Sequence, residues 1–424
     1  MSWLERDYRH LWHPFTQADE WEKQDNLVIA SGEGAWLVDT HGRRYLDGTA
    51  SLWCNVLGHR HPALDAAIRA QLERVSHSTM LGLTHPGAIE LAERLCGLSR
   101  LDRCFYSDSG STAVEVALKM AFQAKQQAGE TARTRFAALT EAYHGDTVGS
   151  VSVGGIDLFH GIYKPLLFDA VRVPSPERAG EFEEACLTRA RAIFAEHGPT
   201  ICALVAEPLV QGAAGMRTHS PAFLRALCAM AREHGAYVIL DEVATGFGRT
   251  GTMFACEAAG VVPDFLCVAK GLTGGYLPLA ATLTTEAVYD NFRGPYTEYR
   301  TFFHGHTYTG NPLACAVALA TLDALPPVLE RLPFAALREA MASIRHPAVR
   351  EIRALGLMGA VVLHPQDPAA RVGHRAALAA RRHGAIVRNL GDAIVVMPPL
   401  TITVEEIQRL ARAVEGGIHD VLGD

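Results

Sequence analysis

Short apolar runs alternate with longer amphipathic segments through the middle of the chain. Apolar runs of this length, bounded by polar or small residues, are typical of buried strands. The expected strands are Arg103–Ser107, Phe136–Thr140, Cys202–Glu207, Tyr237–Asp241, Phe265–Ala269 and Leu279–Thr284. Residues 112–123 carry apolar residues at the spacing of one helix face, and Thr112 to Glu115 has the pattern of a capping box at its start. Alternating strands and helices predict an α/β fold with a mostly parallel, doubly wound sheet.

The last hundred residues have a different pattern. Strands are expected at 357–364, 385–388 and 393–397, and a helix near 371–382. Thr403 and Glu406 form a second capping-box pattern before a final amphipathic helix. The N-terminal segment contains the turn signals Gly32, Gly34 and Gly42 around short strands. We predict a large domain over 50–322 and a smaller α+β domain built from 1–49 and 323–424.

Length and composition agree with a globular protein of two domains. The chain has 424 residues, more than one hydrophobic core usually holds, with 49% hydrophobic and 20% charged residues. The net charge of -7 and the lack of a Lys/Arg run argue against nucleic-acid binding. No apolar run approaches the ~20 residues of a membrane helix, and the charged start does not resemble a signal peptide. We therefore expect a cytoplasmic protein without membrane contacts.

Cysteine and histidine spacing gives no sign of a metal site. The nine cysteines include no C-x-x-C pair, so reduced thiols are expected. The closest histidine pairs, at 59/61 and 304/306, have no carboxylate or cysteine at ligand spacing. The prediction is that the chain binds no metal.

Unusual polar residues follow one predicted strand after another. They are the segment 107–111 with its small residues, Tyr143 in the segment 142–146, Glu207, Asp241 and Lys270. Ligands of open α/β sheets bind beyond the carboxyl ends of the strands, where these residues would meet. Each residue alone also fits a structural role, such as a capped turn, a surface turn, a salt bridge or a lysine reaching solvent.

Taken together, the strand ends match the needs of pyridoxal 5'-phosphate (PLP). This cofactor requires an amine for its aldehyde, a carboxylate for its pyridine nitrogen, a cradle for its phosphate and a flat partner for its ring. Lys270 would hold it as a Schiff base, since a desolvated lysine has a lowered pKa and is nucleophilic. A charged Asp241 at the end of a buried strand needs a cationic partner, which a protonated pyridine nitrogen would supply. Gly110, Ser111 and Tyr143 would serve the phosphate and the ring.

At this point the sequence resembles the class III aminotransferases of PLP fold type I. The stretch DEVATGFGRTG from Asp241, followed by AKGLTGGYLPLAAT from Ala269, is highly specific for that family. Supporting stretches are HLWHPFTQ from His10, YHGDTVGSVSVGG from Tyr143 and FFHGHTYTGNPLACAVAL from Phe302, so the resemblance spans nearly the whole chain. It is closest to the branch that aminates 8-amino-7-oxononanoate to 7,8-diaminononanoate in biotin biosynthesis.

The resemblance implies a role for each site residue. Lys270, Asp241 and Tyr143 would be catalytic, with Lys270 also moving the proton at the substrate carbon. Cofactor contacts are expected from Gly110, Ser111, Tyr143, His144, Glu207, Asp241, Val243, Lys270 and Thr307. Substrate contacts are expected from Phe15, Trp53, Tyr143, Asp146, Arg249 and Arg388, with Arg388 on the carboxylate of the keto acid. Thr307 would reach the phosphate across a dimer interface, which implies a homodimer.

Three positions depart from the commonest family pattern and leave the amino donor open. Phe15 stands where many members have Tyr, Leu52-Trp53 where many have Trp-Trp, and His306 where many have Pro. These differences resemble the members that use L-lysine, whereas most members use S-adenosylmethionine.

Other activities on the same fold remain open from the sequence. They are an ω-aminotransferase acting on ornithine, 4-aminobutyrate or a diamine, a PLP-dependent aminomutase or racemase, and a non-catalytic PLP-binding protein. A nicotinamide-dependent dehydrogenase is disfavoured, because no G-x-G-x-x-G follows the early strands.

Overall fold

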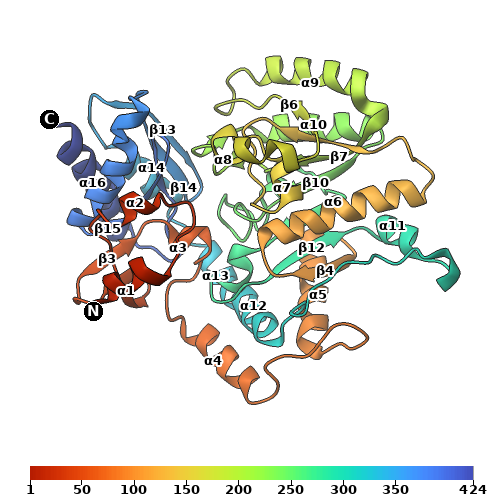
Figure 1. Cartoon of the computed structure of the whole chain (residues 1–424), viewed down its shortest axis with the longest axis horizontal. Coiled ribbons are helices and arrows are strands. Elements are labelled where there is room, and N and C mark those ends of the chain that lie inside the picture. Colours follow the sequence, from red (N-terminus) through yellow and green to blue (C-terminus); the bar gives the residue numbers. More distant parts are fainter. Residues whose placement is uncertain (424) are drawn as a thin grey trace.

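In the computed structural model, which describes residues 1–423, the two ends of the chain lie together beside a body formed by its middle (Figure 1). The middle of the chain builds a seven-stranded sheet, and the ends build two four-stranded sheets. The division predicted at residues 49/50 and 322/323 stays a prediction.

The seven-stranded sheet is mostly parallel, as predicted. Its order is β4-β12-β11-β10-β7-β5-β6, and only β12 runs antiparallel to its neighbours. The strands are β4 (Arg103–Ser107), β5 (Arg135–Leu139), β6 (Val171–Val173), β7 (Ile201–Ala206), β10 (Tyr237–Asp241), β11 (Phe265–Val268) and β12 (Ala280–Thr284). The apolar runs therefore located all of these strands except the short β6. With helices around this sheet, the α/β fold class is confirmed.

Helices cover both faces of the large sheet, so its central strands are apolar on both sides. The main helices are α4 (Pro62–Leu72), α5 (Pro86–Ser99), α6 (Gly110–Gln127), α9 (Glu183–His197), α10 (Pro221–Glu233) and α12 (Pro312–Ala324). In β10, Ile239 packs in the cluster beneath α6, whereas Val238 and Leu240 belong to the cluster on the other face. This alternation fixes the register of the strand that ends at Asp241.

Helix α6 begins at Gly110, so the start predicted at Thr112 was wrong. Ser109 is the N-cap: its hydroxyl accepts the Thr112 N–H at 3.3 Å, and the Thr112 hydroxyl accepts the Ser109 N–H at 3.0 Å. Thr112 is therefore the N3 residue of the capping box and lies within the helix, not at its N-cap. Glu115, the expected box partner, instead accepts the N–H of Gly149 at 2.7 Å.

The smaller sheets join the two ends of the chain. One has the order β1-β2-β3-β15, and the other has the order β13-β14-β17-β16. Their strands are β1 (Ile29–Glu33), β2 (Trp36–Asp39), β3 (Arg44–Asp47), β13 (Val349–Leu355), β14 (Met358–Leu363), β15 (Ala385–Ile386), β16 (Arg388–Leu390) and β17 (Ala393–Val396). The strand predicted at 385–388 is in fact split between the two sheets, and Arg388 follows the crossing point.

The C-terminal helices pack on these sheets. They are α14 (Phe334–Ala342), α15 (Val372–Ala379) and α16 (Val404–Leu422). The predicted cap of α16 is confirmed, because Thr403 and Glu406 form a capping box. Within residues 1–423 no helix combines the length and the apolar character that a membrane crossing requires.

Candidate active site

A cavity of about 690 Å³ opens at the carboxyl ends of the parallel strands. It brings together most of the residues that the sequence indicated. These are Trp53, Gly110, Ser111, Tyr143, His144, Asp146, Glu207, Asp241, Val243 and Lys270. They come from segments far apart in the chain, so the cavity exists only in the folded molecule.

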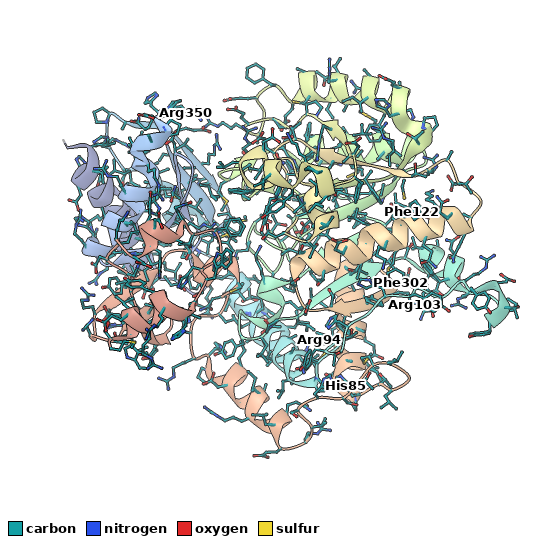
Figure 2. All side chains as sticks on the ribbon, viewed as in Figure 1. His85, Arg94, Arg103, Phe122, Phe302 and Arg350 are labelled. Atoms are coloured by element: carbon teal, nitrogen blue, oxygen red, sulfur yellow. The ribbon has the colours of Figure 1, made fainter. Side chains whose placement is uncertain are left out.

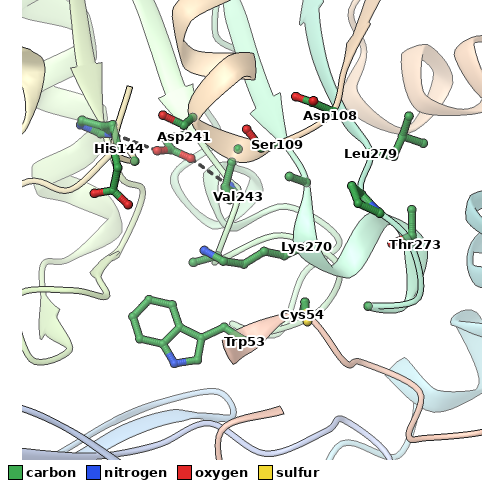
Figure 3. A pocket seen from close by; sticks show the side chains of 18 of the residues that line it. Trp53, Cys54, Asp108, Ser109, His144, Asp241, Val243, Lys270, Thr273 and Leu279 are labelled. Carbon is green, nitrogen blue, oxygen red and sulfur yellow. Dashed lines mark hydrogen bonds and ion pairs between the residues drawn. The ribbon is translucent and has the colours of Figure 1, made fainter. Parts of the chain in front are cut away.

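Asp241 is held rigidly at the inner wall of the cavity. Its side chain is buried, its Oδ2 lies 2.7 Å from Nδ1 of His144, and its Oδ1 accepts the Val243 N–H at 3.0 Å (Figure 3). An ionised carboxylate only accepts, so with Asp241 ionised the proton in this contact is donated by Nδ1 of His144. His144 therefore orients an anionic oxygen pair, which is suited to a cationic ring nitrogen.

Lys270 lies in the middle of the cavity. Its side chain extends between Val243 and Trp53, and its Nζ is 5.2 Å from the centre of the Trp53 ring (Figure 3). Burial lowers the pKa of Lys270, although the nearby Asp241 and Glu207 carboxyl groups act in the opposite direction. A larger share of neutral amine makes this lysine a better nucleophile toward an aldehyde.

The start of α6 provides a cradle for an anion. The N–H groups of Gly110 and Ser111 have no hydrogen-bond partner among residues 1–423, and they lie at the positive end of the helix dipole. A Cβ at position 110 would lie 2.5 Å from Cγ1 of Val243, so only glycine fits there. This close approach leaves the cradle next to Val243, within reach of a ring held at Asp241.

A hydrogen bond joins the Tyr143 backbone to the Glu207 side chain beside the cradle. Oε1 of Glu207 accepts the Tyr143 N–H at 3.1 Å, and its Oε2 accepts the Gly212 N–H at 3.0 Å. Burial raises the pKa of Glu207 to about 7. The Tyr143 hydroxyl donates to Asp146 at 2.8 Å, and burial raises the pKa of Tyr143, so it remains a neutral donor.

Trp53 forms the wall opposite Val243. It ends α3 (Ala50–Trp53), whose four residues have φ values of 45°, 47°, 70° and 72°, a left-handed turn without glycine. Such a conformation costs roughly 1–2 kcal/mol per residue. Strain of this kind is usually kept at functional sites.

Arg388 and Phe15 lie together beyond Tyr143. The Arg388 guanidinium is 5.6 Å from the centre of the Phe15 ring, and Phe15 meets Phe159 edge-on at 5.6 Å. Burial lowers the pKa of Arg388, while the neighbouring Tyr143 and Asp146 raise it. Neither residue is part of the wall of the 690 Å³ cavity, but Arg388 is close enough to Asp146 to extend the site outward.

Arg249 and Thr307 are not brought to the cavity wall. Arg249 is fully buried, donates to the carbonyl groups of Asn55 and Pro398, and has its pKa lowered to about 10 by burial. Thr307 is exposed and begins the turn at 307–310, five residues after Phe302, which is labelled in Figure 2. Their predicted substrate and phosphate contacts stay predictions.

The sequence reasoning missed the loop that closes the cavity after Lys270. Thr273, Tyr276 and Leu279 line this side. The Tyr276 hydroxyl donates to Asp65 at 2.9 Å and so ties the loop to α4. The two glycines before Tyr276 were the available signal, because they mark a shaped loop.

Comparisons with known proteins agree with this geometry. The family model described as aminotransferase class III matches residues 18–417. The adenosylmethionine-8-amino-7-oxononanoate aminotransferase of Nitratidesulfovibrio vulgaris is 53% identical, covering 97% of this chain and 80% of that protein. The protein of the same name from Geobacter sulfurreducens is 48% identical, covering 98% and 97%.

Solved structures give the same result. The crystal structure of adenosylmethionine-8-amino-7-oxononanoate aminotransferase from Methanocaldococcus jannaschii superposes with a TM-score of 0.94 at 38% identity, over 98% of both chains. A PLP-bound amine transaminase from an uncultivated Pseudomonas species superposes with a TM-score of 0.91 at 37% identity, over 97% of this chain and 98% of that one. The chain therefore belongs to the class III aminotransferases.

Proposed function

We propose that this chain is a PLP-dependent transaminase that converts 8-amino-7-oxononanoate to 7,8-diaminononanoate, a step of biotin biosynthesis. The observation that carries the proposal is the pairing of a buried amine, Lys270, with a fixed carboxylate, Asp241, in one cavity that Arg388 borders. The names of the relatives from Nitratidesulfovibrio vulgaris and Geobacter sulfurreducens support this substrate.

The cavity fits PLP at three separate points. Asp241 would accept a hydrogen bond from the ring nitrogen, the free N–H groups of Gly110 and Ser111 would bind the phosphate, and Val243 would contact the ring. When bound, PLP supplies an aldehyde that takes up an amino group and a ring that withdraws electrons from the neighbouring carbon.

Lys270 would act twice through the same nitrogen. Its lowered pKa favours the neutral amine, which can join the aldehyde and, once displaced by a substrate amine, can accept a proton from the substrate carbon. Trp53 and Val243 lie on either side of the Lys270 side chain. Nζ would therefore stay close both to the aldehyde carbon that it joins and to the substrate carbon whose proton it accepts.

Arg388 and Asp146 would orient the keto acid by charge. The guanidinium would bind the carboxylate at one end of 8-amino-7-oxononanoate, and the Asp146 carboxylate would bind the ammonium beside the keto group. Tyr143 is linked to both groups, since its hydroxyl donates to Asp146 and its phenol interacts electrostatically with the Arg388 guanidinium. This arrangement leaves the keto carbon toward Lys270.

Two amino donors are candidates. The relatives named for adenosylmethionine favour S-adenosylmethionine, whereas Phe15, Leu52 and His306 resemble the lysine-using members. The test is to incubate purified holoenzyme and 8-amino-7-oxononanoate with either donor and to measure the diamine by mass spectrometry. Diamine with one donor supports the proposal. No diamine with either donor, together with turnover of ornithine or 4-aminobutyrate, would establish the alternative ω-aminotransferase.

The active form is proposed to be a cytoplasmic homodimer. Large apolar side chains protrude from the surface, among them Trp12 at 94%, Leu81 at 90%, Leu158 at 84% and Ile162 at 83% exposure. We propose that a second copy of the chain covers these exposed side chains, since large apolar surfaces are common at interaction sites. Light scattering during gel filtration should then give twice the 45.8 kDa of the single chain.

A further inference from the structure

Asp47 is a buried carboxylate that faces the left-handed turn carrying Trp53. It is 1% exposed and lies at the end of β3. Its Oδ1 accepts the Ser51 N–H at 2.9 Å, and its Oδ2 accepts the Ser51 hydroxyl at 2.7 Å. Nε2 of His59 lies 2.9 Å from the same Oδ2, and the Thr49 hydroxyl lies 3.3 Å from Oδ1.

These contacts oppose the strain of the turn. Residues 50–53 all have a positive φ, in the left-handed region that non-glycine residues rarely adopt, so the local sequence gives no reason for this conformation. Two of the hydrogen bonds to Asp47 end on Ser51, inside the turn, and charge-assisted bonds of this kind are stronger than neutral ones. Burial alone would raise the pKa of Asp47, but the bonds from His59 and Ser51 keep it below its usual value, so the carboxylate stays ionised.

Asp47 also lies next to the strand that leads to Arg388. It is aligned with Ile386 in the parallel pair of β3 and β15, and the Gly48 N–H donates to the Ile386 carbonyl at 2.9 Å. Arg388 follows two residues later. We call the space between Trp53 and Arg388, where the keto acid would bind, the substrate slot. The end of β3 therefore contacts both walls of this slot, which are the turn that carries Trp53 and the strand that leads to Arg388.

We infer that Asp47 is a positioning residue for the substrate slot: fixed by His59 and holding the left-handed turn through Ser51, it sets the indole of Trp53 against Lys270. It touches neither cofactor nor substrate and acts through Trp53. The inference rests on the proposed function only where it concerns the keto acid, because the placement of Trp53 is independent of which substrate is used.

Asp39 offers a matched control in the same sheet. It is also buried and accepts the N–H groups of His41 and Arg43 at 2.9 Å each and Nε of Arg43 at 2.7 Å. Its turn lies outside the cavity wall. Asp39→Asn therefore reproduces the loss of a buried, well-bonded carboxylate without touching the Trp53 turn.

The experiment compares holoenzymes carrying Asp47→Asn, Trp53→Ala, both changes, or Asp39→Asn. We expect Asp47→Asn to keep its cofactor content and to raise KM for 8-amino-7-oxononanoate about tenfold, the factor that corresponds to 1.4 kcal/mol. The KM of the double variant should lie within twofold of the KM of Trp53→Ala, because Asp47 acts only through Trp53. Asp39→Asn should leave KM unchanged even if it lowers Tm.

The visible circular dichroism of the bound cofactor gives a readout without turnover. Asp47→Asn and Trp53→Ala should change this band alike, and Asp39→Asn should not. Additive effects on KM, or an equal effect of Asp39→Asn on the band, would overturn the inference. If the wild type does not aminate the keto acid, the proposed function fails while the dichroism still decides the role of Asp47. Should Asp47→Asn not fold, Ser51→Ala, which removes one of the hydrogen bonds, must reproduce the spectral change.

Discussion

Replacing Asp241 by Asn tests the electronic part of the proposed chemistry. The amide has the same shape, and its oxygen can still accept from the Val243 N–H or from His144, which lie 3.0 Å and 2.7 Å from the carboxylate oxygens. What disappears is the negative charge of a side chain that is only 5% exposed. Removing one partner of a buried ion pair costs about 3–5 kcal/mol.

That cost should appear in the rate, because the charge would stabilise the protonated ring as electrons move into it. At 1.36 kcal/mol per factor of ten, kcat should fall by about 10²- to 10⁴-fold. The assay is a stopped-flow half-reaction that follows the cofactor spectrum after mixing holoenzyme with the working donor. Cofactor content is measured on the same sample to separate slow chemistry from lost PLP.

Asp264→Asn is the control for that experiment. Asp264 immediately precedes β11, at the amino ends of the parallel strands and so away from the cavity, and its Oδ2 accepts the Val238 N–H at 2.8 Å. This variant should alter Tm and leave the half-reaction unchanged. A fully loaded Asp241→Asn enzyme that reacts at the wild-type rate would refute the assigned role of the carboxylate.

Further predictions concern other residues of the site. Arg388→Met should raise KM for the keto acid by roughly 10- to 150-fold with kcat little changed, because a charge-assisted bond worth about 1.5–3 kcal/mol is lost; an unchanged KM would place the carboxylate elsewhere. Burial raises the pKa of Glu207 from 4.5 to about 7, so protonated Glu207 favours the folded state. This contribution to the free energy of unfolding is present near pH 5 and is lost as the pH rises through 7. The unfolding free energy of the apoenzyme should therefore drop by about 2 kcal/mol more between pH 5 and pH 8 in wild type than in Glu207→Gln; parallel pH profiles would contradict this. Thr307→Ala should weaken PLP binding at least about tenfold if the residue reaches the partner's phosphate, and an unaltered Kd for PLP would exclude that contact.

The sequence alone was enough to predict most strands of the large sheet and to identify the polar residues at their ends. Buried parallel strands are continuous apolar runs, so the residue that ends each run is recognisable, and both Asp241 and Lys270 line the cavity. The start of α6 was misjudged because Ser109 and Thr112 are both good caps. Only the folded backbone decides which one lies outside the helix.

The walls of the slot depend on contacts that no local pattern contains. Ser51 of the left-handed turn at 50–53 donates to Asp47, and Asp47 is in turn bonded by His59, so both partners lie outside the turn. Arg388 reaches the site because the chain crosses from β15 to β16, and that crossing is decided by pairing with β3. The proposed contact of Thr307 with a phosphate would depend on a second copy of the chain, which no local pattern can place.

The most direct test of the account is to locate the lysine that binds the cofactor. The chain has only five lysines, at positions 23, 119, 125, 164 and 270, and of these only Lys270 lines the cavity. Holoenzyme would be reduced with borohydride, digested and mapped by mass spectrometry for the phosphopyridoxyl group. The account predicts the label on Lys270 alone and none in Lys270→Ala; a label on another lysine, or a wild-type protein that takes up no PLP, would contradict it.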